Sequence, residues 1–211
     1  NGEFWQLEIV SLLTGESRLE PLQEAAVEAY ADAAVFEGMS GDDLRRVLRR
    51  YEGHPFAMDA AVRLLQDGVA ESELPERAEP TVFAAKQWEV LKEDHGADAV
   101  RLIEAMAVLE VAAPMDVVHA VAGVDSAARK SLLAKSFVRG LVREEAEGLR
   151  LYHALFLEHV QKELEGDVEH RNGYHTRAVE IMREQLGKQP PDSFSATRLW
   201  RHATILDGFE I

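Results

Sequence analysis

Hydrophobic and polar residues alternate with a helical period along most of this chain of 211 residues. Apolar side chains recur every three or four positions, which is typical of amphipathic helices that bury one face. The segments predicted to be helical are 22–36, 42–50, 56–65, 82–94, 97–109, 115–121, 126–137, 154–164 and two stretches after 167. The pattern therefore predicts a mainly α-helical protein.

The period changes once, between Leu141 and His153. Apolar and polar residues alternate there around a turn that contains Gly148, which indicates a β-hairpin. Three of the predicted helices, this hairpin and the helix that follows it are the parts of a winged helix. That order of elements predicts a winged-helix domain with a short β-hairpin.

The stretch 70–81 is rich in Glu, Pro and Ser and has few residues to bury, so it is predicted to be a linker and a hinge. The chain then divides into a helical region over 1–69, the linker, a winged-helix domain over 82–165 and a helical tail over 166–211. The two tail helices could begin an array of tetratricopeptide-like repeats, or they could pack back onto the winged helix.

Charge and composition exclude several classes of protein. The formal net charge of −15 makes nucleic acid and anionic membrane surfaces poor partners. The absence of cysteine excludes disulfides and thiolate metal sites. His170 and His175 are five residues apart on a predicted helix and do not share a face, so we predict no metal site there. No apolar run has transmembrane length, and we expect a cytoplasmic protein with no membrane partner.

The segment Gly53-His54-Pro55 separates two predicted helices. Proline has no backbone N–H and a restricted φ, so it ends one helix and suits the first turn of the next. This corner resembles the "GxP" corner, commonly written GxPLAL, in the lid domain of STAND-class signalling ATPases (NB-ARC or AP-ATPase-like, related to AAA+). Phe56 and Met58 stand where that family more often has Leu.

The resemblance extends from about Leu19 to Leu164, because a winged-helix pattern follows the corner at the distance expected for this family. It implies that the first residues are the end of an NTPase core and that 1–69 includes a helical lid. It also implies that Pro55, with Gly53 in the same corner, lies against the adenine of bound ADP or ATP.

His153 resembles the histidine of the family's "MHD" element, which reaches the β-phosphate of ADP. The triplet here is Tyr152-His153-Ala154, so the histidine is kept and the aspartate is absent. The resemblance implies that His153 and Pro55 face one nucleotide from adjoining domains. The alternative is a histidine that only caps or orients the hairpin.

No G-x-x-x-x-G-K-[ST] phosphate-binding loop occurs in the sequence, so this chain by itself is not expected to be an enzyme or to bind a cofactor. The resemblance places the P-loop domain N-terminal to residue 1 and makes ADP or ATP a ligand of the longer parent. The expected function is a regulatory segment that couples the nucleotide state to domain rearrangement. Its expected partners are the upstream P-loop domain, other proteins at the tail and, in the active state, further copies of itself.

Two other functions remain open. The first is a winged-helix DNA-binding regulator, with Arg129, Lys130 and Lys135 of the acid-free helix 126–137 as the contacts. The acidic chain and the acidic hairpin segment 144–147 oppose this alternative. The second is a helical scaffold for protein interactions, which would act through the tail.

Overall fold

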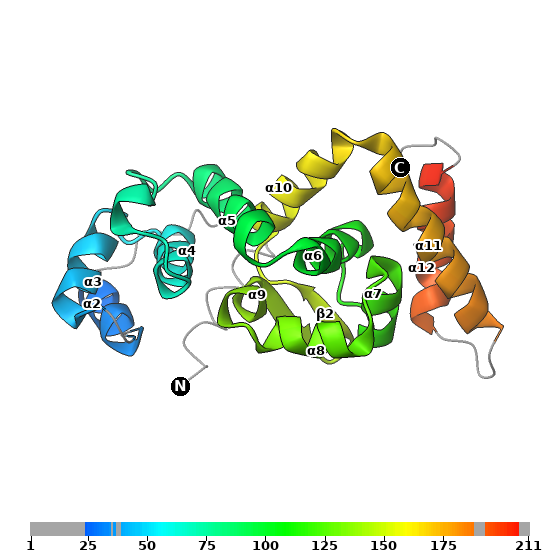
Figure 1. Cartoon of the computed structure of the whole chain (residues 1–211), viewed down its shortest axis with the longest axis horizontal. Coiled ribbons are helices and arrows are strands. Elements are labelled where there is room, and N and C mark those ends of the chain that lie inside the picture. The colour runs from blue at the N-terminus through cyan, green and yellow to red at the C-terminus, as the bar shows by residue number, and fades with distance from the viewer. Residues whose placement is uncertain (1–23, 35, 37–38, 188–192, 207–211) are drawn as a thin grey trace. The chain divides into compact units, whose positions relative to one another are not determined.

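The computed structural model describes residues 24–34, 36, 39–187 and 193–206. These residues are mainly helical, with one short antiparallel hairpin (Figure 1), which confirms the predicted fold class. The chain divides into two compact units, Asn1–Glu79 and Pro80–Ile211. The predicted end of an NTPase core lies before residue 24, outside the described residues.

The first unit is helical throughout its described part. Its elements are α2 (Glu24–Ala33), α3 (Gly41–Arg49), α4 (Pro55–Gln66) and a 3₁₀ turn, η1 (Glu71–Glu73). Ser40 caps α3 because its hydroxyl oxygen accepts a hydrogen bond from the backbone N–H of Asp43 at 3.1 Å. The predicted apolar stripe of α3 (Leu44, Val47 and Leu48) is fully buried.

The predicted linker 70–81 is in part packed on the first unit. Leu74 is buried, and the hydroxyl of Tyr51 donates to the backbone carbonyl of Pro75 at 3.1 Å. Glu71 pairs with Arg50 at 2.5 Å. The division between the two units falls within this segment, after Glu79. The role of 70–81 as a hinge stays a prediction.

The second unit is built around one buried helix. Its elements are α5 (Pro80–Asp94), α6 (Ala97–Leu109), α7 (Met115–Ala122), α8 (Ser126–Ala134), α9 (Ser136–Leu141), β1 (Val142–Glu145), β2 (Gly148–Leu151), α10 (Ala154–Glu165), α11 (Val168–Leu186) and α12 (Ser193–Leu206). Every residue from Leu102 to Leu109 is buried, and α6 contacts α5, α7, α8, α10, α11 and β2. This helix is apolar on nearly all sides because other elements surround it.

The hairpin and the helices around it form a winged helix. β1 and β2 pair in register from Val142 opposite Leu151 to Glu145 opposite Gly148. Ala113, between α6 and α7, adds a one-residue third strand, because it exchanges backbone hydrogen bonds of 3.0 and 2.9 Å with Leu149. Gly148 has φ +137°, and a Cβ there would lie 1.9 Å from the carbonyl oxygen of Ala113. Glycine is required at this crossing.

The predicted single helix 126–137 is wrong. The chain forms α8 and α9 instead, with Lys135 in an extended conformation (ψ 125°) between them. Leu132 and Phe137 are both buried. The ring of Phe137 stacks on the ring of His95, with 4.8 Å between the two ring centres. Residues five apart do not share one face of a continuous helix, so the break allows both side chains to reach the core.

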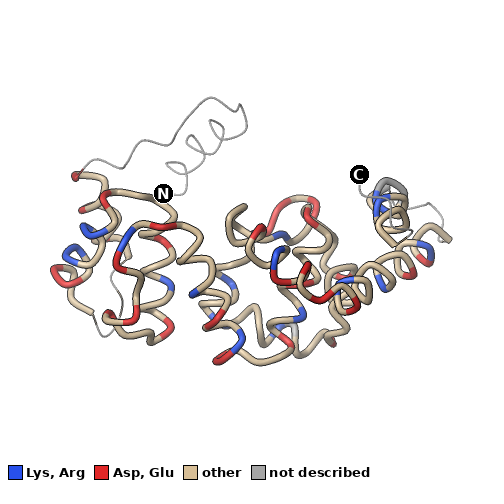
Figure 2. The backbone as a smooth tube through the Cα atoms, turned by 90° about the horizontal axis from the view of Figure 1, so that it is seen from above, with Lys and Arg blue, Asp and Glu red and all other residues tan. Residues whose placement is uncertain are grey.

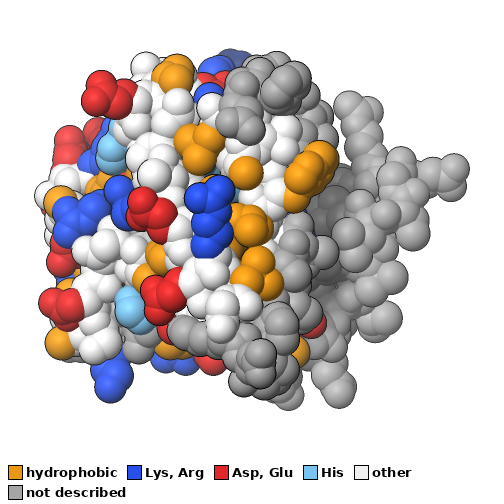
Figure 3. Space-filling view, turned by 90° about the vertical axis from the view of Figure 1, so that its right-hand side faces the viewer, with side chains coloured by type: hydrophobic (Ala, Val, Ile, Leu, Met, Phe, Trp, Pro, Cys, Tyr) orange, Lys and Arg blue, Asp and Glu red, His pale blue; other side chains and the backbone are white. Residues whose placement is uncertain are grey.

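The tail helices belong to the same compact unit as the winged helix. α11 packs against α12, and it also contacts α6, α7 and α10. Figure 3 faces the end of the second unit that bears α11 and α12, where hydrophobic side chains lie among charged ones. Trp200 of α12 is 66% exposed. The described tail therefore packs back onto the winged helix, and whether it also starts a repeat array stays a prediction.

Candidate functional site

The corner at Gly53 and Pro55 joins α3 to α4. Glu52 and Gly53 have positive φ values of 49° and 74°, which turns the chain sharply. His54 is the N-cap of α4: its Nδ1 accepts from the backbone N–H of Ala57 at 3.4 Å. Pro55 occupies the first helical position, where its missing N–H costs nothing. Pro55 remains partly exposed.

His153 lies between β2 and α10. It is the N-cap of α10, and its Nδ1 accepts a hydrogen bond from the backbone N–H of Leu155 at 3.2 Å. Because a backbone N–H can only donate, this Nδ1 carries no proton, and the ring proton of the neutral imidazole is on Nε2. An Nε2–H group can donate to a phosphate oxygen. The capping role expected of a structural histidine is thus present, and it is compatible with a ligand contact.

Pro55 belongs to the first compact unit and His153 to the second. Both residues lie at the start of a helix. Pro55 directly follows the N-cap residue of α4, and His153 is itself the N-cap of α10. Their joint contact with one nucleotide stays a prediction.

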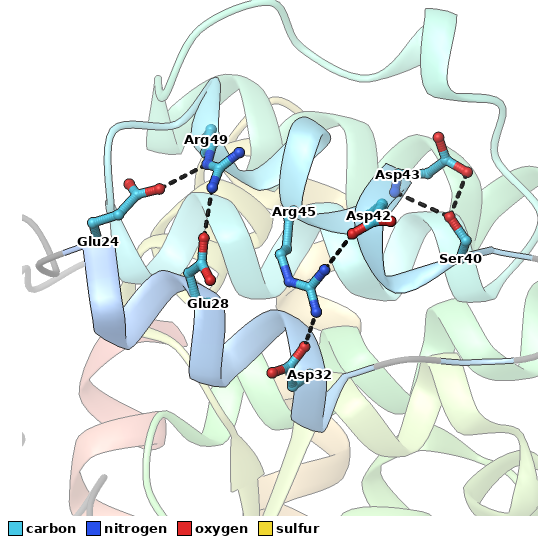
Figure 4. A network of polar contacts seen from close by, with 8 residues as sticks. All are labelled: Glu24, Glu28, Asp32, Ser40, Asp42, Asp43, Arg45 and Arg49. Carbon is cyan, nitrogen blue, oxygen red and sulfur yellow. Dashed lines mark hydrogen bonds and ion pairs between the residues drawn. The ribbon is translucent and has the colours of Figure 1, made fainter.

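The four arginines of the segment 45–50 all pair with acidic side chains, and Figure 4 shows the pairs of Arg45 and Arg49. The pairs are Arg45 with Asp32 and Asp42, Arg46 with Asp43 and Glu71, Arg49 with Glu24 and Glu28, and Arg50 with Glu71. Figure 2 shows cationic and acidic residues alternating over this unit. The hydrogen bond that Arg45 donates to Asp32 raises the pKa of the Arg45 guanidinium. A phosphate would have to displace carboxylates to bind here. Arg45 and Arg49 join α3 to α2, whereas Arg46 and Arg50 connect this segment to η1.

The proposed DNA contacts lie on or next to α8. Lys130 and Lys135 are exposed, and Lys135 occupies the break between α8 and α9. Arg129 lies in α8, and its side chain is outside the described residues. On the hairpin, Glu145 pairs with Arg150 at 2.8 Å and with Arg143 at 3.5 Å. The cations of the hairpin are therefore neutralised by its own acid.

A buried polar cluster joins α6 to α11, and sequence reasoning missed it. The carboxylate of Glu104 is 7% exposed and accepts the hydroxyl of Tyr174 at 2.7 Å. His170 Nε2 lies 3.0 Å from the same oxygen. Burial, then the hydrogen bond to Glu104, raise the pKa of Tyr174. The signal was present in the sequence, because Glu104 is an acid in the middle of the apolar run 102–109.

Two buried histidines join α11 to α12. Nδ1 of His175 lies 2.9 Å from Nδ1 of His202, and both side chains are almost fully buried. Burial and, to a smaller extent, the nearby cation of Arg201 lower the pKa of both imidazoles to about 4. His170 and His175 therefore have separate partners, Glu104 and His202. Among the described residues, no group of three or more His, Cys, Asp or Glu side chains is arranged to hold a metal ion.

Comparisons with protein-family models, with curated proteins and with solved structures found no match to this chain. In the part of the chain that the structure describes, every helix is too short or too polar to cross a membrane. Function is therefore argued from the residues and their geometry.

Proposed function

We infer that this chain is the regulatory segment of a STAND-class signalling ATPase. In this proposal the helical first unit is a lid, and the winged helix responds to whether ADP or ATP occupies a P-loop domain upstream of residue 1. The chain itself hydrolyses nothing. The parent protein is cytoplasmic, and the nucleotide state controls how the winged helix and tail meet their partners, including further copies of the chain.

The observation that carries the proposal is the position of His153. A hairpin of four-residue strands ends at Leu151, and His153 follows at the start of α10. The cap fixes the orientation of the imidazole through Nδ1, which leaves Nε2 as the proton-bearing nitrogen. A donor held in this way favours a phosphate at one distance and direction. A contact made only in the ADP state would bias the equilibrium between two domain arrangements.

The corner of the first unit supports the same function. Glu52 and Gly53 make a tight turn that places Pro55 at the start of α4 with part of its surface exposed. A proline ring is rigid and apolar, so it can pack against an adenine face without losing side-chain freedom. The lid would hold the base while the winged helix holds the phosphate.

The first test is to read the coding sequence upstream of Asn1. The expected result is a G-x-x-x-x-G-K-[ST] sequence after a predicted strand, and a chain without one would overturn the proposal. The second test uses the protein that includes that domain. Loss of a hydrogen bond from His153 to the ADP phosphate is expected to weaken ADP binding by roughly tenfold to a hundredfold.

The structure offers a matched pair of variants for His153. His153→Asn retains a capping oxygen and removes the Nε2 donor, whereas His153→Ala removes both. The proposal predicts that both variants bind ADP more weakly, and that only His153→Ala lowers the thermal midpoint without nucleotide. If His153→Asn binds ADP as tightly as the parent, the histidine has only a capping role.

The alternative of a winged-helix DNA-binding regulator has less support. α8 ends at Ala134, and the exposed acids Glu144 and Glu147 lie on the hairpin that would approach phosphates. The third function, a protein scaffold, is favoured by one observation: Trp200 exposes 66% of its surface on the tail. Exposed aromatic side chains are frequent at protein interfaces.

A further inference from the structure

An exposed cationic surface lies on α8 and α9. We name the side chains of Lys130, Lys135 and Arg139 the basic face. All three are exposed, and none forms a hydrogen bond or ion pair through its side chain with another described residue. Lys135 and Arg139 are one helical turn apart, since the N–H of Arg139 donates to the carbonyl of Lys135 at 3.0 Å. The two side chains therefore start within one helical turn of each other.

The surrounding sequence concentrates this charge. Residues 126–143 contain five Lys and Arg residues and no Asp or Glu, in a chain whose net charge is −15. Several other cations of the second unit have acidic partners: for example, Arg101 pairs with Asp98, and Arg201 pairs with Glu110. Like charges one turn apart repel each other. Carboxylates from another molecule would relieve this repulsion and pair with the cations.

The shape of the surface suits a close approach. The exposed neighbours of the basic face on α8 are Ala127, Ser131 and Ala134, which lie on one side of the helix at positions i, i+4 and i+7. Small side chains leave the backbone of α8 accessible to a partner helix. Figure 1 shows α8 and α9 along one edge of the second unit, on the opposite side from the turn between α10 and α11. No described element of this unit covers them.

The charges favour an acidic protein segment over nucleic acid. A duplex bound to a winged helix runs past both α8 and the hairpin, where Glu144 and Glu147 are exposed and Glu145 neutralises Arg143. A short helix can pair with the basic face and stop before the hairpin. At physiological salt the Debye length is about 8 Å, so acids elsewhere on the chain repel such a short segment only weakly.

We propose that the basic face of α8 and α9 docks an acidic helix of a partner protein, with carboxylates spaced three to four residues apart to match Lys130, Lys135 and Arg139. This interaction does not depend on nucleotide and goes beyond the function proposed above. Complementary charge at such a surface raises the association rate and gives specificity. The partner is distinct from any that binds the exposed Trp200 of the tail.

The test uses the whole chain and two labelled helical peptides, one with Glu at i, i+4 positions and one with Gln in their place. The variant Lys135→Glu/Arg139→Glu reverses one Lys and one Arg of the basic face. The matched control, Lys162→Glu/Arg183→Glu, reverses one exposed Lys and one exposed Arg on α10 and α11. Circular dichroism establishes that each variant is folded.

The expected result is that the Glu peptide binds, more weakly as salt rises, and that the Gln peptide does not. We expect Lys135→Glu/Arg139→Glu to weaken binding by at least about tenfold and the control by less than about twofold. Three results would overturn the proposal: no preference for the Glu peptide, an equal loss in the control, or tighter binding of a DNA duplex than of the peptide at 150 mM salt. A fourth is self-association that the basic-face variant abolishes while the peptide stays unbound.

Discussion

Replacing Tyr174 with Phe tests whether the buried cluster between α6 and α11 stabilises the second unit. The substitution removes only the hydroxyl, which donates to Glu104 at 2.7 Å. The ring keeps its place, including its contact with the guanidinium of Arg177 at 4.5 Å from the ring centre. The carboxylate of Glu104 is 7% exposed, so water cannot fully replace the lost donor.

A hydrogen bond to a charged group contributes about 1.5–3 kcal/mol. Glu104 keeps its contact with His170, whose side chain is 46% exposed. We therefore expect the free energy of unfolding to fall by an amount near the middle of that range, about 2 kcal/mol. Urea unfolding followed by far-ultraviolet circular dichroism and by the fluorescence of the buried Trp88 would measure it.

Glu104→Gln provides the matched control, because a neutral amide accepts a weaker hydrogen bond from the same hydroxyl. In that background Tyr174→Phe is expected to cost about 1 kcal/mol or less, which gives a coupling energy of about 1 kcal/mol between the two residues. A cost below about 0.5 kcal/mol in the parent, or an equal cost in both backgrounds, would show that the hydroxyl does not stabilise the buried carboxylate.

Other regions of the structure yield three further predictions. The folded pKa of about 4 for His175 and His202 lies below the ordinary value of 6.5, so the unfolded chain takes up protons first and stability falls as pH drops from 6.5 toward 4. Thermal midpoints at several pH values measure this, and a variant with Gln at both positions should lose the dependence. Gly148→Ala should destabilise the second unit by more than about 2 kcal/mol in urea, because its Cβ would overlap the carbonyl of Ala113. Arg49→Gln should leave the urea midpoint unchanged within error, because its ion pairs are exposed, and a clear shift would contradict that assignment.

Local sequence features were sufficient to predict most helices and the hairpin. The predicted helix 97–109 is α6 residue for residue, and the alternation between Leu141 and His153 is the hairpin. Both patterns act over a few residues, since they depend on which side chains share a face and on turn residues such as Gly148. The helix 126–137 was predicted wrongly because no Gly or Pro marks the break at Lys135.

The candidate site was only partly predictable, because sequence patterns describe a few neighbouring residues and not the contacts between distant ones. The resemblance to family motifs was enough to single out Pro55 and His153, which lie next to the starts of predicted helices. It was not enough to show that His153 caps α10 through Nδ1, because that depends on the rotation of the ring at the end of β2. Each of the four arginines of segment 45–50 pairs with an acid more than ten residues away, such as Asp32 or Glu71, and no local pattern shows these pairs.

The sequence alone therefore determined the elements, their order and the acidic character of the chain, because periodicity, caps and composition are local or additive properties. Tertiary structure alone decided which charges have partners. Glu104 meets Tyr174 and His175 meets His202 only because α11 packs against α6 and α12. The basic face stays without a partner because no described element packs on the outer side of α8. Such pairings depend on contacts between distant segments, which no pattern along a single helix contains.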